Sequence, residues 1–344
     1  MTDQINTRKT DHLRALAEDA GIERHDTGFD GLRLTHRALP ELDLSKIDTS
    51  VTFMGKELSF PLLISSMTGG DSDEILRINR NLAEAAEECR VAMGVGSQRV
   101  MFTKPSARDS FALRKYAPTT VLLANIGVVQ LNFGFTEKEF QGAVEVLGAD
   151  GIYLHINPLQ EAVQPEGDID FSSLGPKIAD LVKKLDVPVL FKEVGSGLSI
   201  PDIDIGLKAG VRHFDVAGRG GTSWSRIEYH RRAEENDDLG MVFQDWGITT
   251  VESLSDAYAY LQEHDKQATL IASGGIRTGI DMAKAVILGA NMCGIAAPFL
   301  YAAQESRQAV IDRITAFKRQ FQTALFLLGC ADCDALRGNK SLIR

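Results

Sequence analysis

The chain has few cysteines and no excess of positive charge. Its 344 residues include 4 Cys, 37 Lys and Arg, and 47 Asp and Glu, which gives a net charge of −10. Binding of nucleic acid needs a broad basic surface, so we expect no nucleic-acid partner. Four cysteines are too few for a disulfide scaffold of this length. Cys330 and Cys333 form a C-x-x-C pair, but a second pair of zinc ligands is missing, and we interpret them as helix-end thiols without a function.

Long hydrophobic runs are also scarce. The first twenty residues carry charges throughout and contain no apolar core of signal-peptide length, so we expect a cytoplasmic protein. The one charge-free stretch long enough to suggest a membrane span, residues 285–304, is rich in Ala and Gly and contains Asn291 and Pro298. True spans are richer in Leu, Ile and Phe, so we interpret this stretch as a helix end followed by a buried strand and expect no membrane partner.

Short apolar runs alternate with amphipathic stretches, which is typical of repeated βα units and a parallel sheet. We expect strands at 61–65, 91–95, 121–124, 151–156, 187–192, 213–217, 269–272 and 292–296. We expect helices at 73–89, 106–116, 136–147, 173–184, 199–209, 250–264, 279–288 and 306–328. Eight strand-helix pairs predict an α/β fold, a (β/α)8 TIM barrel.

The barrel prediction divides the chain into three parts. Residues 1–60 form an N-terminal extension, residues 61–330 the barrel, and residues 331–344 a C-terminal tail. Within the extension, the pattern of residues 51–60 predicts a β-hairpin that plugs the N-terminal end of the barrel. The connection from Gly218 to Trp246 is long and densely charged, and it is either a solvated surface insertion or a lid over the site.

The carboxyl ends of barrel strands carry the active site in this fold, and here they are small and polar. Gly274 and Gly275 follow the seventh strand and lead into a helix, and the eighth strand ends in Ala296 and Ala297. Together with the Gly220-Gly221-Thr222 turn, these small residues let backbone N–H groups approach a phosphate at a helix N-terminus. The pattern predicts a phosphate site at these strand ends.

Lys192 ends an apolar strand and is expected to point into the barrel mouth. A structural ion pair with Glu193 is the plain explanation of a buried lysine, while a Schiff base or a cation beside an electron-rich cofactor ring are the functional ones. Asn125, Thr68 and Ser97 can hydrogen-bond the edge of a heterocycle and favour the cofactor ring. With a single phosphate site, this indicates flavin mononucleotide (FMN). No strand is followed by a dinucleotide-type G-x-G-x-x-G, so a permanently bound NAD is not indicated.

The motifs now reached resemble those of a known enzyme family. RKTDH, MTGG, MGVGSQR, HINPLQE, FKEVGSG, GRGGTSW, WGI and ASGGIRTG together are similar to the FMN-dependent type 2 isopentenyl-diphosphate delta-isomerases over almost the whole chain. The resemblance implies a 1,3-allylic proton shift that interconverts isopentenyl and dimethylallyl diphosphate in isoprenoid biosynthesis. It also implies reduced FMN, Mg²⁺, NADPH as the flavin reductant, and a homo-oligomer, a tetramer or an octamer.

The resemblance also assigns roles to residues. It implies catalytic functions for His155, Asn157, Gln160 and Lys192, and Mg²⁺ binding by Glu161. It implies that the substrate diphosphate contacts Arg8, Lys9, His12, Ser97, Gln98, Arg99 and Gln160. It implies FMN binding by Ser66, Met67, Thr68, Ser97, Asn125, Lys192, Thr222, Gly275, Ile276, Arg277, Ala296 and Ala297.

Two other functions fit parts of the pattern. One is an FMN oxidoreductase that acts on a hydroxy acid, although the N-terminal cations and the Gln160-Glu161 pair suit a diphosphate and magnesium better than a carboxylate. The other is a barrel that binds flavin or phosphate as a sensor or scaffold without catalysis, which the complete set of polar strand ends argues against. Measuring turnover distinguishes the three.

Overall fold

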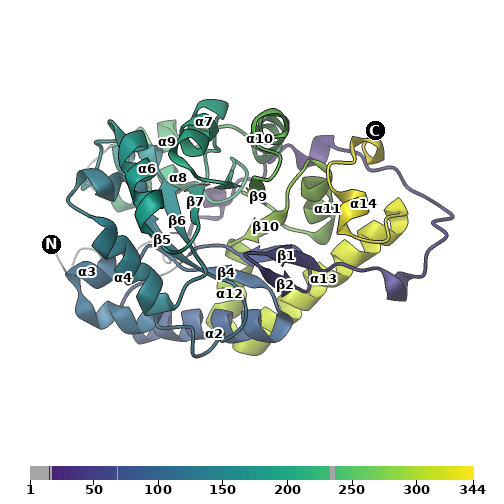
Figure 1. The fold of residues 1–344 in the computed structure, drawn as a ribbon, viewed down its shortest axis with the longest axis horizontal. Coiled ribbons are helices and arrows are strands. Elements are labelled where there is room, and N and C mark those ends of the chain that lie inside the picture. The colour runs from purple at the N-terminus through teal and green to yellow at the C-terminus, as the bar shows by residue number, and fades with distance from the viewer. Residues whose placement is uncertain (1–14, 16–17, 68, 233–236) are drawn as a thin grey trace.

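Eight parallel strands close into a barrel in the computed structural model, which describes residues 15, 18–67, 69–232 and 237–344 (Figure 1). The strands follow each other around the ring in chain order, and the last pairs with the first. The (β/α)8 fold is therefore confirmed. The barrel strands are β3 (Leu62–Ile64), β4 (Ala92–Gly94), β5 (Leu122–Gly127), β6 (Gly151–Ile156), β7 (Val189–Glu193), β8 (His213–Asp215), β9 (Thr269–Ser273) and β10 (Met292–Ile295).

The strand register sets the level of the polar side chains. His155 on β6 pairs with Lys192 on β7, and Lys192 pairs with Asp215 on β8. These three residues come at or near the carboxyl ends of three adjacent strands. The parallel register therefore brings together side chains that lie 60 residues apart in the chain.

Helices surround the barrel, and most begin at the caps that the sequence provides. Ser72 caps α2, while Thr136, Thr249 and Thr278 begin α4, α10 and α11 with capping boxes. The long α13 packs against α2, α11 and α12 (Figure 1). The predicted outer helices are found as α2 (Asp73–Cys89), α4 (Glu137–Leu147), α6 (Leu174–Lys184), α7 (Ile200–Ala209), α10 (Thr250–His264), α11 (Gly279–Ile287) and α13 (Arg307–Leu328).

One predicted helix is wrong. Residues 106–116 do not form an α-helix; a short α3 (Val100–Thr103) is followed by the 3-10 helix η4 (Pro105–Phe111). Pro105 disfavours helical backbone at the residue before it, and Lys104 is extended with φ −135 and ψ 96. The helix therefore breaks at Lys104, and the segment continues as a tighter 3-10 turn.

Besides α3, five short α-helices of the described chain were not predicted. They are α5 (Pro158–Val163), α8 (Trp224–Arg232), α9 (Leu239–Val242), α12 (Ala297–Glu305) and α14 (Cys333–Leu336). The charge-free stretch 285–304 thus contains the end of α11, strand β10 and most of α12. Among the helices of the described chain, none is long and apolar enough to cross a membrane.

The N-terminal extension closes the bottom of the barrel with the expected hairpin. β1 (Val51–Phe53) and β2 (Lys56–Leu58) pair antiparallel around a turn in which Met54 and Gly55 have φ of 49 and 73. Phe53 and Leu58 pack with barrel residues such as Leu63 and Leu123 in one buried cluster. The hairpin is therefore the predicted plug.

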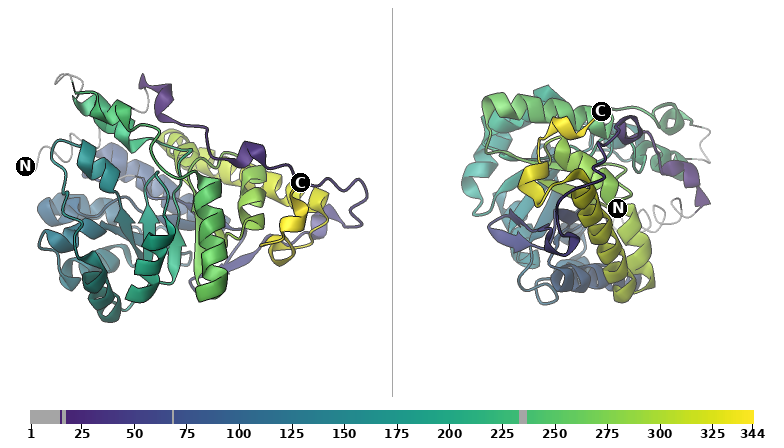
Figure 2. Two further views of the ribbon diagram at one scale, coloured as in Figure 1. Left: turned by 90° about the horizontal axis from the view of Figure 1, so that it is seen from above. Right: turned by 90° about the vertical axis from the view of Figure 1, so that its right-hand side faces the viewer.

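The rest of the extension runs over the opposite end of the barrel and its outer surface. Its 3-10 helices are η1 (Ala20–Ile22), η2 (Phe29–Gly31) and η3 (Leu44–Lys46). Ile22 of η1 packs on Ile227 of α8, and the views of Figure 2 show this purple segment beside the green helix. Leu34 forms a bridge with Ile343, so the C-terminal residues lie along the extension.

Candidate active site

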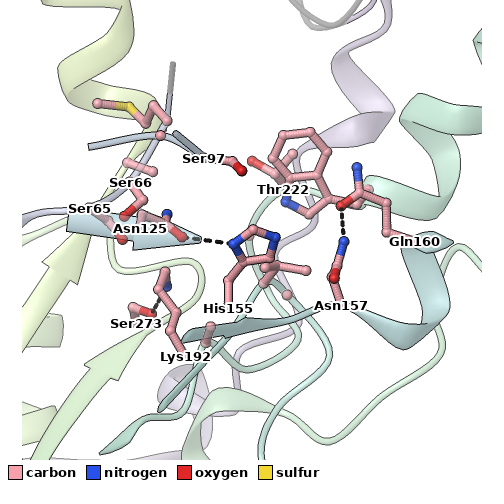
Figure 3. Close-up of a pocket in the computed structure, with 18 of the residues that line it drawn as sticks. Ser65, Ser66, Ser97, Asn125, His155, Asn157, Gln160, Lys192, Thr222 and Ser273 are labelled. Atoms are coloured by element: carbon pink, nitrogen blue, oxygen red, sulfur yellow. Dashed lines mark hydrogen bonds between the residues drawn. The ribbon is translucent and has the colours of Figure 1, made fainter. Parts of the chain in front are cut away.

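A cavity of about 430 Å³ lies at the carboxyl ends of the barrel strands. All eight strands or the residues directly after them contribute to its wall, together with Trp224 of α8. Its lining includes Ser65, Ser66, Ser97, Asn125, His155, Lys192, Gly218, Ser273 and Ala296 (Figure 3). This is the place where enzymes of this fold carry out their chemistry.

The cavity brings together most of the residues that the sequence predicted. Thr68, Arg8, Lys9 and His12 lie outside the described residues. All four expected catalytic residues, His155, Asn157, Gln160 and Lys192, line the cavity. So do the remaining members of the expected FMN set, namely Ser66, Met67, Ser97, Asn125, Thr222, Gly275, Ile276, Arg277, Ala296 and Ala297.

Lys192 belongs to a buried polar network. Its Nζ lies 3.1 Å from Asp215 Oδ2 and 3.4 Å from Ser273 Oγ. The Asp215 carboxylate also accepts hydrogen bonds from Tyr153 and Ser273. Burial, followed by the Asp215 charge, raises the Tyr153 pKa well above its usual value, so this phenol stays protonated. The partner of Lys192 is thus Asp215, not Glu193, and Asp215 was missed although it is the one charged residue within β8.

His155 is held in one orientation by Asn125. Its Nδ1 lies 2.7 Å from Asn125 Oδ1 (Figure 3), and the amide NH₂ of Asn125 donates to the carbonyl of Val95 at 3.0 Å. Since the Asn125 oxygen only accepts, His155 Nδ1 carries the proton. A Cβ on Gly127 would lie 2.9 Å from His155 Nε2, so the glycine leaves room for the imidazole.

Asn157 and Gln160 are joined to two buried carboxylates. The Asn157 amide donates to Gln160 Oε1 at 3.1 Å (Figure 3) and to Glu161 Oε1 at 2.9 Å. Gln160 Nε2 in turn donates to Glu228 Oε1 at 2.9 Å, and Arg231 binds the other oxygen of Glu228. Glu228 lies on α8, in the charged run that the sequence left open as surface or lid, and it is fully buried.

The charged connection from Gly218 to Trp246 therefore has a structural role. Trp224 lines the cavity, Ile227 and Glu228 have no exposed surface, and α8 packs against α5 and η1. Every third or fourth residue of α8 faces inward, a pattern that the surrounding arginines and glutamates obscure. The helix forms part of the cavity wall rather than a solvated insertion.

Arg99 is the described cation of the expected diphosphate site. It lines the cavity and pairs with Asp168 at 2.5 Å, and Gln130 Nε2 also donates to Asp168 at 2.9 Å. Gln98 is fully buried and does not line the cavity; its side chain bonds to the backbone of Ala143 and Asn125 at 2.9 and 3.0 Å. The side chain of Gln98 thus supports strand β5 from behind.

Glu161 is one of three carboxylates of the described chain that line the cavity, with Glu166 and Asp168. Its Oε2 accepts the backbone N–H of Asp168 at 2.7 Å and a hydrogen bond from Gln164. Among the described residues, no three His, Cys, Asp or Glu side chains are grouped as a metal cage. Glu161 therefore suits a Mg²⁺ ion that takes its other ligands from substrate oxygens and water.

The predicted phosphate site is built by close backbone contacts. A Cβ on Gly221 would lie 2.8 Å from the backbone nitrogen of Gly275, so the loops after β8 and β9 touch at their glycines. Gly275 has a φ of +74, which side chains rarely adopt. Gly221 and Gly275 both line the cavity, and close approach of glycine backbones is typical of phosphate-binding loops.

Two helix N-termini, those of α11 and α12, follow the strand ends for which the sequence predicts a phosphate site. The start of α11 near Gly279 is closed by its own capping box, in which Asp281 accepts the N–H groups of Arg277 and Thr278 at 3.1 and 2.9 Å. The start of α12 at Ala296 has no side-chain cap within the described chain, and Ala296 lines the cavity. The open N–H groups for an anion are therefore those of α12.

Two buried side-chain oxygens of cavity residues have no hydrogen-bond partner among the described residues. Ser66 Oγ and Asn157 Oδ1 are inaccessible to solvent and make no hydrogen bond to any residue that the structure describes. Buried polar atoms are normally satisfied, so such atoms in a cavity wall indicate a ligand. Ser66 belongs to the expected flavin set and Asn157 to the expected catalytic set. The residues of the cavity wall therefore fit a flavin and a substrate beside it.

The two cysteines of the C-x-x-C pair lie in surroundings that keep their thiols protonated and unreactive. Cys330 and Cys333 are free thiols that contact the carbonyls of Ala335 and Thr49. Burial raises the pKa of Cys333 to about 12 and also raises that of Cys330. Both side chains pack in the hydrophobic core.

Glu193 is a buried carboxylate beside the cavity. Its Oε2 accepts N–H groups from Val194 and Gly195 at 2.6 and 2.5 Å and from Gly197 at 3.2 Å. Burial raises its pKa from 4.5 to about 7, although these N–H groups act in the opposite direction. The residue thus fixes the turn after β7 and titrates near neutral pH.

We expect Glu193→Gln to remove a pH dependence of stability. Because the folded pKa is about 7 and the ordinary value 4.5, the protonated form stabilises the fold fully below pH 4.5. That contribution, on the order of 3 kcal/mol, is lost as the pH rises to about 7. Urea unfolding from pH 4.5 to 8 should show this decline in the unmodified protein but not in the variant, whereas the exposed Glu263→Gln should keep it. Parallel profiles for all three proteins would contradict the assignment.

Comparisons with known proteins agree with the fold. The family model described as FMN-dependent dehydrogenase matches residues 2–109 and 161–343. A flavocytochrome b2 variant with sulfite bound has a TM-score of 0.70 at 19% identity, over 97% of this chain and 82% of that one. A mandelate oxidase variant has a TM-score of 0.62 at 16% identity, over 92% and 88%. At these identities the structures show the fold alone.

Sequence relatives are much more similar. An isopentenyl-diphosphate delta-isomerase of Paracoccus zeaxanthinifaciens is 66% identical over 98% of this chain and 97% of its own length. Enzymes of the same name from Hydrogenovibrio crunogenus and a Nostoc species are 54% and 46% identical, over 98% and 99% of this chain and 98% and 97% of their own lengths. On these full-length matches, the chain belongs to the isopentenyl-diphosphate delta-isomerase family, type 2, within the FMN-dependent dehydrogenases.

Proposed function

We propose that the protein interconverts isopentenyl and dimethylallyl diphosphate with reduced FMN and Mg²⁺. The observation that carries this proposal is the single cavity whose wall contains every described member of both the expected flavin set and the expected catalytic set. The names of its relatives supply the substrate. The reaction adds a proton to one carbon of the alkene and removes one from another.

The flavin would lie across the glycine-lined strand ends. Arg277 and the N–H groups at the start of α12 would hold its phosphate, while Ser66 Oγ, which lacks a protein partner among the described residues, would bond the cofactor. When bound and reduced, FMN would supply a ring nitrogen able to give and take a proton. Lys192, which is paired with Asp215, would place a positive charge beside the ring.

The diphosphate would bind at the opposite wall. Arg99 has five N–H donors, so its guanidinium can bind diphosphate oxygens while it remains paired with Asp168. Glu161 would hold Mg²⁺ together with those oxygens. Arg8, Lys9 and His12 remain predicted contributors from the extension.

The remaining polar side chains would orient the alkene and handle protons. An alkene is a very weak base, so protonation needs a dry pocket that stabilises positive charge. Trp224 and the α8 helix wall off this part of the cavity. His155, whose Nδ1 proton is fixed by Asn125, would direct Nε2 for proton exchange, and Asn157 and Gln160 would position the substrate.

Other properties remain predictions from the family resemblance. They are reduction of the flavin by NADPH, a place in isoprenoid biosynthesis, a cytoplasmic location and assembly into a tetramer or octamer. The three proposed parts of the chain, 1–60, 61–330 and 331–344, likewise remain a prediction.

An anaerobic assay tests the function. We expect a yellow protein that bleaches on reduction and only then converts isopentenyl diphosphate in the presence of Mg²⁺, with conversion followed by NMR and abolished by EDTA. A yellow protein that is inert in both redox states would favour the oxidoreductase or the non-catalytic flavin binder instead. Refilling the apoprotein with 5-deazaflavin mononucleotide, which lacks the acid-base nitrogen, should abolish turnover; full activity would contradict the proton-transfer role.

A further inference from the structure

The phosphate end of the cavity carries a carboxylate from the N-terminal extension. Glu23 pairs through Oε2 with the guanidinium of Arg277, and its Oε1 accepts a hydrogen bond from Thr222 Oγ1 at 2.7 Å. Its side chain is only 17% exposed. Arg277 and Thr222 both line the cavity, whereas Glu23 contacts them from the side of the extension.

The backbone around Glu23 is tied to the same turn. Glu23 forms an antiparallel bridge with Thr222, and the flanking bonds run from Ser223 N to Ile22 O at 2.8 Å and from Arg24 N to Gly221 O at 3.1 Å. Residues 22–24 thus lie as a short strand against the turn after β8. Any movement of this turn is transmitted to the extension.

Arg24 stabilises this arrangement through hydrogen bonds to backbone carbonyls. Its guanidinium donates to the carbonyls of Gly195 at 2.6 Å, Thr222 at 3.2 Å and Gln244 at 3.0 Å. Burial lowers its pKa to about 10, which still leaves it protonated at neutral pH. The segment is further docked on α8, where Arg226 binds Asp19 at 2.6 Å.

The hydrogen-bond capacities define what Glu23 does. The Thr222 hydroxyl has one proton, and it is donated to Glu23, so a phosphate at this point would be met by backbone N–H groups and by Arg277. Arg277 uses one bond for Glu23 and one for the Ile276 carbonyl, and its remaining N–H groups stay available to the cavity. An arginine fixed in this way by a carboxylate needs no reordering when an anion binds.

We propose that Glu23 is a positioning residue for the flavin phosphate, and that it couples docking of residues 18–24 to occupancy of the phosphate site. Phosphate binding stabilises the observed positions of Arg277 and Thr222. Glu23 of the extension contacts both side chains in these positions. The two events therefore stabilise each other. The proposal rests on FMN as the cofactor.

Titration of the apoprotein with FMN and with riboflavin, which lacks the phosphate, tests this coupling. We expect Glu23→Gln to weaken FMN binding by roughly tenfold, because a charged pair that orders Arg277 is lost. Riboflavin binding should be unchanged. Asp26→Asn is the matched control, since Asp26 lies on the same segment and pairs at 2.8 Å with Arg219, which does not line the cavity, and it should change neither affinity.

Amide hydrogen exchange of residues 19–26 gives a second readout. In the unmodified protein, FMN should slow exchange of this segment more than riboflavin does, and Glu23→Gln should abolish the difference. Unchanged FMN affinity, tighter FMN binding, or an equal loss for both flavins would each overturn the proposal. Flavin binding by the unmodified protein separates the two hypotheses. If the unmodified protein binds neither flavin, the cofactor assignment fails and this proposal fails with it. If the unmodified protein binds FMN and Glu23→Gln binds it with the same affinity, only this proposal is overturned.

Discussion

Lys192→Met is expected to lower isomerase turnover by roughly a thousandfold or more and to destabilise the protein as well. The lysine is 8% exposed in its side chain and the Asp215 partner 0%. Removing one member of a buried ion pair leaves the other charge uncompensated, which costs about 3 to 5 kcal/mol. The loss of turnover has a separate origin, because the positive charge beside the proposed flavin ring disappears.

A double variant separates these two effects. In Lys192→Met/Asp215→Asn, the amide oxygen still accepts from one of the two hydroxyls, Tyr153 or Ser273, and the amide NH₂ can donate to the oxygen of the other, so most of the stability should return while turnover stays lost. Urea unfolding and anaerobic turnover of the single and double variants measure the two quantities. Recovery of activity together with stability would show that Lys192 has only the structural role.

Gly275→Ala is expected to weaken FMN binding by roughly a hundredfold and to destabilise the fold by about 3 kcal/mol or more. A Cβ at this position would overlap the carbonyl oxygen of Gly220 and the methyl group of Thr27. The oxygen belongs to backbone and cannot turn aside as a side chain does, so the two phosphate-site loops must separate.

Gly55→Ala is a closely matched control for this substitution. Gly55 has φ +73 against +74 at Gly275, but a Cβ at Gly55 meets nothing within 4 Å. Its cost should be limited to the backbone term, about 1 to 2 kcal/mol, with FMN affinity unchanged. Denaturant unfolding measures the loss of stability in both variants, and flavin titration measures the change in their FMN affinity. Equal stability losses with unchanged FMN affinity would show that close packing of the loops has no part in phosphate binding.

The predictable part of the fold is the part governed by local chemistry. Strand β6 and helices α2 and α10 have the bounds that the sequence predicts, because apolar runs and caps such as Ser72 and Thr249 lie next to each other in the chain. The error at 106–116 is also local in origin, since Pro105 breaks the periodicity that the apolar residues suggest. Helix α8 was missed because its inward residues are separated by charged ones.

The cavity residues could be predicted because strand ends in a barrel converge on one face whatever their spacing in the chain. The small polar residues after the apolar runs indicated Asn125 and Ser97 as site residues, and the family resemblance added Ser66 and His155, all of which line the cavity. Glu23 and Glu228 could not be found this way. They come from the extension and from a helix beyond a strand end, and only packing brings them against Arg277 and Gln160.

By itself the sequence determined the closed barrel and the strand-end location of the site, because periodicity, caps and strand order are properties of neighbouring residues, and the family resemblance supplied many residues of the cavity wall. The tertiary structure alone decided the partners: Asp215 for Lys192, Glu23 for Arg277, and the start of α12 rather than that of α11 as the helix N-terminus without a side-chain cap. Such pairings depend on side-chain direction and on loops meeting across the barrel mouth. Hydrogen bonds and ion pairs act over a few ångströms in space, and distance along the chain does not specify them.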